Sequence, residues 1–132
     1  MLSRESVREF RSSWLPNITD AGLERLIDLL EKSSPLLIHG CFTRAVPMGC
    51  LATHIAWNHP DTVHLTVDAG INWMNRIAGL NPATSHVIRE WDGCGTNHWE
   101  IRSEFLVLVR EEQKRRKATS RPTRSAAELV KV

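Results

Sequence analysis

The 132-residue sequence has no tyrosine, only three phenylalanines and no long apolar run. Apolar runs such as residues 35–38 are far shorter than the roughly 20 residues that a helix needs to cross a bilayer. The opening ten residues, MLSRESVREF, also lack the apolar core of a secretory signal peptide. We therefore expect a soluble, cytoplasmic protein with no membrane-embedded segment.

Cysteine is also scarce, and the three that occur, Cys41, Cys50 and Cys94, are an odd number. In a chain without an export signal, this favours free thiols or metal ligands over a framework of disulfides. The sequence contains no Cys-x-x-Cys pair, no His-Glu-x-x-His motif and no phosphate-binding loop ending in Lys-Ser/Thr. It therefore carries no complete catalytic or metal-binding signature.

What is present is the composition of a globular domain, with 42% hydrophobic and 24% charged residues. A chain of this length fits one domain. Tryptophan supplies most of the aromatic side chains, at five positions. We expect these indoles to pack in the core, because a large apolar ring gains most from burial; a stacking platform is the alternative.

Helical periodicity dominates the first half of the chain. Ser3 is placed to cap one helix, and Thr19 or Asp20 to cap a second. The second helix repeats leucine and isoleucine at positions i, i+3, i+4 and i+7, opposite charged residues. A third helix is expected to begin at Pro47 and to end before residues 58–60, Asn-His-Pro.

Three further helices are expected, over residues 61–80 with a stop at Gly79, from Pro82 to Gly93, and from His98 to Lys117. The sequence therefore predicts an all-α fold, a compact bundle of five or six helices. The alternative is an α+β fold with a small sheet from residues 36–39 and 62–67, where apolar residues also suit strands.

Charge is unevenly distributed along the chain. Residues 110–132 contain eight Lys and Arg and three Glu, a balance of +5, whereas residues 1–109 have a balance of −3. We expect residues 1–117 to form a single helical domain and residues 118–132 a basic, disordered tail. Such a tail could contact nucleic acid weakly and without sequence preference.

The segment GCFTRAVPMGCLATHIAWNHP, residues 40–60, holds the first candidate site. A helix that begins at Pro47 places Cys50 in its first turn, where unpaired N–H groups favour an anion and lower a thiol pKa. At 100° per residue, His54 and Trp57 fall on the same side as Cys50. This spacing suits Cys50 as a nucleophile and His54 as its base.

A metal site is the second interpretation of these residues. Cys41, Cys50 and His54 could share one zinc ion, completed by His39, Cys94 or His98. The third interpretation is a buried helix in which Cys50 serves as a small apolar residue and His54 as a hydrogen-bonded core histidine.

Residues 91–98, WDGCGTNH, form a second candidate site for a ligand. Two glycines precede the expected start of the last helix, where free backbone N–H groups favour an anion. Asp92, Cys94, Thr96 and His98 could bind a ligand there, as could Trp57 at the first site. The alternative is a tight connection in which Asp92 or Asn97 caps a helix.

The absence of a complete catalytic set favours a small soluble helical protein that binds or regulates a protein or small-molecule partner, rather than an enzyme. Two alternatives stay open. One is a small enzyme that uses Cys50 and His54, and the other is a metal-binding protein with Cys and His ligands.

Overall fold

The computed structural model describes residues 1–93 and 98–131, with side chains as far as Thr119. Within these ranges the chain forms six α-helices: α1 (Arg4–Glu9), α2 (Asp20–Glu31), α3 (Leu51–Ala56), α4 (Ala69–Asn72), α5 (His86–Asp92) and α6 (His98–Lys131). Two π-helical segments, Phe10–Trp14 and Trp73–Ala78, continue α1 and α4, and a short 3-10 turn spans Leu15–Asn17. The predicted all-α fold is confirmed.

The predicted caps form at the starts of α1 and α2. Ser3 accepts a hydrogen bond from the backbone N–H of Ser6 at 3.1 Å, and Thr19 accepts one from Gly22 at 3.0 Å. The α5 helix begins at His86 rather than at Pro82, because Ser85 acts as its N-cap and accepts from the N–H of Ile88.

The alternative sheet is absent from the described residues. Only isolated bridges occur there, from Leu37 and Thr43 to Gly49, and residues 62–67 lie in turns. Val63 and Val67 are 54% and 62% exposed, so the first half of the helix expected over residues 61–80 also fails to form. Its predicted end is right, since Gly79 closes the helix with a φ of +69°.

The core is mostly aliphatic, and within it aromatic side chains from the π-helical continuations of α1 and α4 join those of α5 and α6. Phe10 meets Phe105 at 4.9 Å between ring centroids, and Trp14 meets Trp73 at 5.3 Å. Trp91 packs on Phe105 at 5.7 Å. Three of the five tryptophans are thus core residues, as expected from their size.

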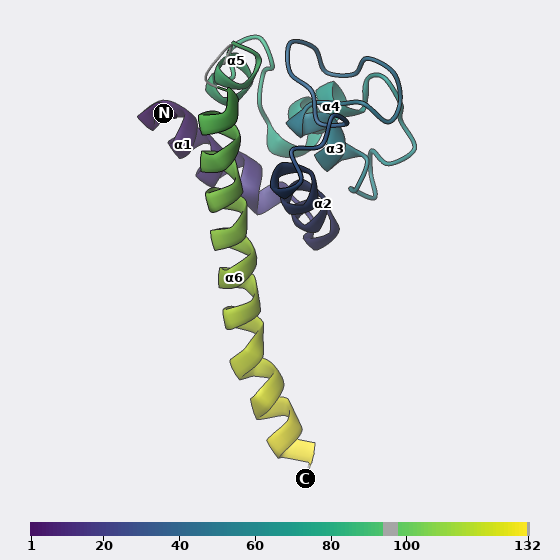
Figure 1. Ribbon diagram of the computed structural model, residues 1–132. Helices are drawn as coiled ribbons and strands as arrows, with labels where there is room; N and C mark the ends of the chain where they lie inside the picture. The colour runs from purple at the N-terminus through teal and green to yellow at the C-terminus, as the bar shows by residue number, and fades with distance from the viewer. Residues whose placement is uncertain (94–97, 132) are drawn as a thin grey trace.

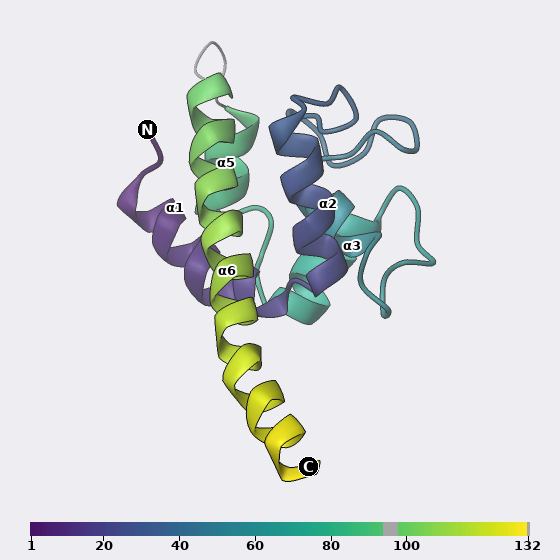
Figure 2. The same ribbon diagram turned by 60° about the horizontal axis from the view of Figure 1, so that its bottom comes forward.

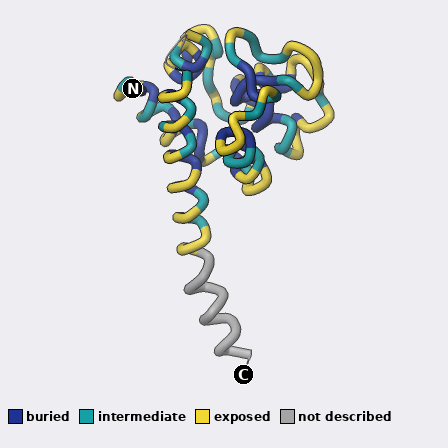
Figure 3. Tube along the Cα trace, in the orientation of Figure 1, coloured by how far each residue is buried: buried dark blue, intermediate teal, exposed yellow. Residues whose placement is uncertain are grey.

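The long helix α6 joins two parts of the molecule. Figures 1 and 2 show α6 between α1 on one side and α2 on the other, continuing well beyond both. It runs past the expected end at Lys117 to Lys131. In the described part of α6, Figure 3 shows buried positions where the helix lies along the other helices. The division into a domain of residues 1–117 and a separate tail stays a prediction.

Candidate functional site

The start of α3 differs from the prediction. The helix begins at Leu51, and Cys50 is its N-cap residue rather than a member of the first turn. Gly49 exchanges backbone hydrogen bonds with Leu36 and Ile38, both at 3.0 Å, and the N–H of Cys50 donates to the Phe42 carbonyl at 2.8 Å. These long-range bonds hold the backbone before Leu51 in a non-helical path, so Pro47 cannot open the helix.

The Cys50 thiol lies in the core. The residue is 1% exposed, and its Sγ atom is 3.7 Å from Thr53 Oγ1. Burial raises the pKa of the Cys50 thiol to about 11, against the weaker opposing effect of hydrogen bonds from Thr53. The expected lowering of this pKa by the helix N-terminus is therefore wrong, and the thiol is protonated at neutral pH.

His54 is a hydrogen-bonded core residue. It is 2% exposed, and its Nε2 lies 2.8 Å from the Leu36 carbonyl oxygen, to which the neutral ring donates. Burial lowers the pKa of His54. The Trp57 ring meets it edge-on with centroids 5.2 Å apart. Because no hydrogen bond joins His54 to Cys50, the geometry lends no support to a nucleophile and base pair.

The metal interpretation is likewise without geometric support among the residues that the structure describes. No group of three or more His, Cys, Asp or Glu side chains converges there on a point that could hold an ion. Cys94 and Thr96 lie outside the described residues. Cys41 is half-buried, and the rings of His39 and His98 stack with centroids 6.0 Å apart.

Asp92 and its neighbours hold the segment before α3 against α5 and α6. Asp92 Oδ1 accepts the Gly40 N–H at 2.9 Å, and Trp91 Nε1 donates to the Ile38 carbonyl at 2.7 Å. Arg102 donates to the Leu37 carbonyl and lies 5.3 Å from the centre of the Trp91 ring. The sequence placed Asp92 and His98 in a ligand site; the described contacts of Asp92 are those of a tether.

The sequence-based reasoning missed one side of α6. At 100° per residue, eight positions from residue 99 to 117 fall in a sector about 120° wide. Six of them are exposed and two are half-buried. We call this the solvent face of α6; it comprises Trp99, Ser103, Leu106, Val107, Arg110, Gln113, Lys114 and Lys117. The spacing of these residues within the helix expected over residues 98–117 was the signal that could have revealed the face.

The solvent face carries cations and no carboxylate. The nearby glutamates turn elsewhere: Glu111 meets Arg11 at 3.5 Å, and Glu112 is 8% exposed and binds Arg116 at 2.7 Å. The arginines beside Glu112 lower the pKa of its carboxyl group. Glu111 and Glu112 are therefore each paired with an arginine, and neither lies on the solvent face.

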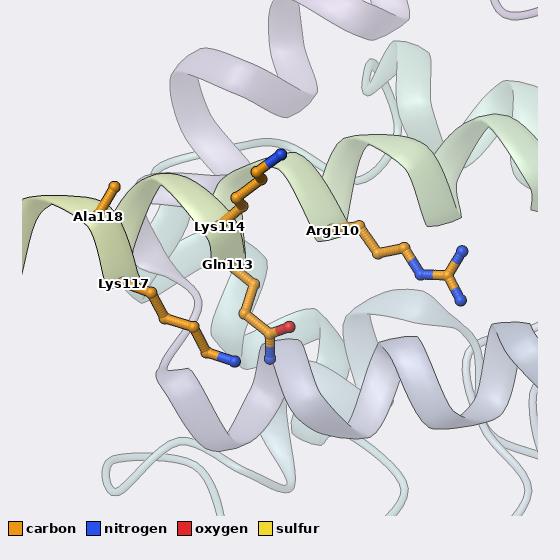
Figure 4. A pocket seen from close by; sticks show the side chains of 5 residues that line it. All are labelled: Arg110, Gln113, Lys114, Lys117 and Ala118. Atoms are coloured by element: carbon orange, nitrogen blue, oxygen red, sulfur yellow. The ribbon is translucent and has the colours of Figure 1, made fainter.

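A hollow of about 300 Å³ lies where the solvent face borders α2. Its lining comes from α6 and is rich in cations: Arg110, Gln113, Lys114, Lys117 and Ala118. Figure 4 shows Arg110, Gln113 and Lys117 directed toward α2, and Lys114 directed away from it. Arg110 also forms an ion pair with Glu31 of α2. The hollow is thus an open cationic groove rather than an enclosed active site.

Comparison of the chain with protein-family models, curated proteins and solved structures finds no match. In the part of the chain that the structure describes, no helix combines the length and apolarity needed to cross a bilayer.

Proposed function

We propose that this protein is a helical binding module whose solvent face of α6 contacts the phosphate backbone of nucleic acid. The supporting observation is that this face holds Arg110, Lys114 and Lys117 and no acidic residue. Phosphate contacts of this kind supply most of the affinity in binding that does not depend on base sequence.

The ion pair between Arg110 and Glu31 does not prevent such a contact. Both side chains are about half exposed, 50% and 48%. Exposed ion pairs contribute little to stability, about 0–1 kcal/mol, so a phosphate can replace the carboxylate at small cost. In the sequence, Arg121 and Arg124 continue the alternating spacing of four and three residues.

The carboxylates of α2 define the direction of approach. Asp20 and Glu31 both contact cations of α6 from the α2 side. These carboxylates disfavour an approach from the α2 side, so a polyanion is expected to approach from the side of Lys114, which points away from α2 (Figure 4), and to draw Arg110 from Glu31. An anionic membrane fits less well, because the basic part of the face, residues 110–117, offers no large apolar side chain for insertion.

The test is fluorescence anisotropy with labelled oligonucleotides, single-stranded and duplex, at several salt concentrations. We expect log Kd to depend linearly on log salt. Lys114→Glu should weaken binding by roughly three- to tenfold and reduce the salt slope by about one. Arg76→Glu is the matched control, since Arg76 is exposed in a different part of the molecule and the charge change is the same.

Failure of the protein to bind either oligonucleotide at 50 mM salt would overturn the proposal. Equal losses for Lys114→Glu and Arg76→Glu would also do so, because they would indicate a response to net charge alone. Binding of polyglutamate in place of DNA would assign the face to an acidic protein partner instead.

A further inference from the structure

We infer that Trp99 stacks on an unpaired base, so that the solvent face of α6 takes single-stranded rather than double-stranded nucleic acid. This inference rests on the proposed function, because the phosphate contacts bring the strand to the face. It adds the class of nucleic acid and the residue that selects it.

Trp99 differs from the other tryptophans in its exposure. Trp14, Trp73 and Trp91 are at most 1% exposed, and Trp57 is half-buried against His54. Trp99 is 57% exposed. Burial of an indole stabilises a fold more than burial of almost any other side chain, so an indole left in water marks a surface available for contact.

Trp99 lies on the same side of α6 as the solvent-face cations that follow it in the helix. Arg110 follows eleven residues later, which is about 16 Å along the helix and about 20° around it. Lys117 stands at the same angle as Trp99, about 27 Å away. Between Trp99 and Arg110 the face contains only uncharged side chains, of which Ser103 and Val107 are exposed. A strand can therefore place phosphates at the cations and a base at the indole.

The indole is held in place by its neighbours. The His98 ring lies 4.6 Å from the Trp99 ring, centroid to centroid, with a tilt of 41°. His98 in turn stacks on His39 of the segment tethered to Asp92. This row of rings anchors Trp99 to the body, which lowers the entropic cost of ordering the indole on a ligand.

The stacking preference follows from the state of the bases. In a duplex each base is already stacked and paired, so an indole on a helix surface gains contact only with the backbone. In a single strand a base can leave its neighbours and stack on the ring, a contact that any base can make because each has a flat aromatic face. The cations favour either form, whereas the indole favours single strands.

The experiment compares labelled dT12 with a blunt 12-base-pair duplex, using the full-length protein and fluorescence anisotropy. We expect Trp99→Ala to weaken binding of dT12 by about tenfold, to leave duplex binding unchanged, and to leave the salt slope unchanged, since no charge is removed. Trp99→Phe should restore most of the affinity. Val63→Ala, at a 54% exposed apolar position outside α6, should bind as the wild type does.

Wild-type affinity of Trp99→Ala for dT12, with Lys114→Glu still defective, would overturn the inference and leave the proposed function standing. Equal losses of Trp99→Ala on dT12 and on the duplex would also overturn it. Absence of binding by the wild type would overturn both the proposed function and the inference about Trp99. Circular dichroism of each variant checks that its helices are intact.

Discussion

The thiol of Cys50 lies beside Thr53 in the core, where a reagent reaches it only when the protein opens. Because burial also raises its pKa to about 11, the reactive thiolate is scarce at neutral pH. We expect iodoacetamide at pH 8 to modify Cys50 at least about a hundredfold more slowly than the half-buried Cys41, with mass spectrometry locating the label. In urea both should react. Equal rates in the native protein would revive the hypothesis of a nucleophilic Cys50.

His54 gives the protein a dependence on pH with a definite sign. Its pKa in the fold lies below the ordinary value of 6.5, since burial disfavours the cation. The unfolded chain therefore binds more protons than the folded one as pH falls below 6.5, and the unfolding free energy decreases. One such group contributes a slope of at most about 1.4 kcal/mol per pH unit.

The measurement is urea unfolding at several pH values between 5 and 7.5, above the range in which the carboxylates titrate. His54→Gln retains a donor for the Leu36 carbonyl and cannot take up a proton, so its stability should vary less with pH than that of the wild type. His59→Gln is a control at a half-buried turn position. Parallel curves for wild type and His54→Gln would contradict the assignment.

Two glutamates connect α1 and α5 reciprocally. Glu9, at the end of α1, accepts hydrogen bonds at the start of α5 from Ser85 Oγ at 2.5 Å and the His86 N–H at 2.8 Å. Glu90, near the end of α5, accepts the Ser3 N–H at 2.8 Å at the start of α1. Each helix thus satisfies the free donors at the N-terminus of the other, which fixes their packing.

We expect Glu9→Ala to reduce the unfolding free energy by about 2 kcal/mol, because it removes several acceptors from one helix start and leaves donors unsatisfied. The Trp14 indole also loses its partner. Glu24→Ala, at an exposed site of α2, should change stability by no more than about 0.5 kcal/mol. Chemical denaturation measures both, and equal effects would refute the reciprocal-cap account.

The sequence predicts a helix end correctly where the end depends on residues close by in the chain. It misplaces an end that depends on residues far away in the chain. Ser3, Thr19 and Gly79 act within one or two turns, so their roles are legible in the sequence. The start of α3 depends on hydrogen bonds from Gly49 and Cys50 to residues earlier in the loop. No local pattern encodes such pairing, and the same holds for Glu9, which meets Ser85 across 76 residues.

The candidate site shows the same limit. The sequence placed Cys50, His54 and Trp57 on one side of a helix, and the structure brings His54 and Trp57 together. That side faces the core because Leu36 and Phe42 lie against it. The spacing of residues 50–57 does not indicate that these two residues pack there. The sequence could not predict that Trp99 is exposed. The five tryptophans are the same residue type, and only their surroundings in the fold distinguish the exposed one from the buried ones.

On the scale of the whole molecule, the acidic and basic parts of the sequence lie at different ends of the structure. The mildly acidic residues 1–109 form most of the helical body, whereas α6 from Arg110 to Lys131 is basic, passes along α2 and then extends beyond the body (Figure 1). A polyanion is therefore attracted to one end of the molecule and repelled by the rest. This polarity predicts that part of the nucleic-acid affinity comes from a length of α6 that the stability of the fold does not need.

Arg116 lies near the end of the length of α6 that stabilises the fold. It donates to the Leu15 carbonyl at 2.7 Å and contacts Asp20 at 2.9 Å and Glu112 at 2.7 Å, so it joins α6 to the body. A chain that ends at Ala118 keeps these contacts, so its unfolding free energy should stay within about 0.5 kcal/mol of the full-length value.

The same truncation removes a net charge of +2, from Arg121, Arg124 and Lys131 against Glu128. Its affinity for DNA should fall and its salt slope should decrease by about two, because fewer phosphates are neutralised.

A chain that ends at Glu111 is the contrasting variant. It also loses Glu112 and Arg116, and should be less stable by about 1–3 kcal/mol, since the Leu15 carbonyl loses a charged donor. Equal stability of the two truncations would show that residues 112–118 do not stabilise the body, and an unfolded chain ending at Ala118 would show that the body extends further along α6 than Arg116.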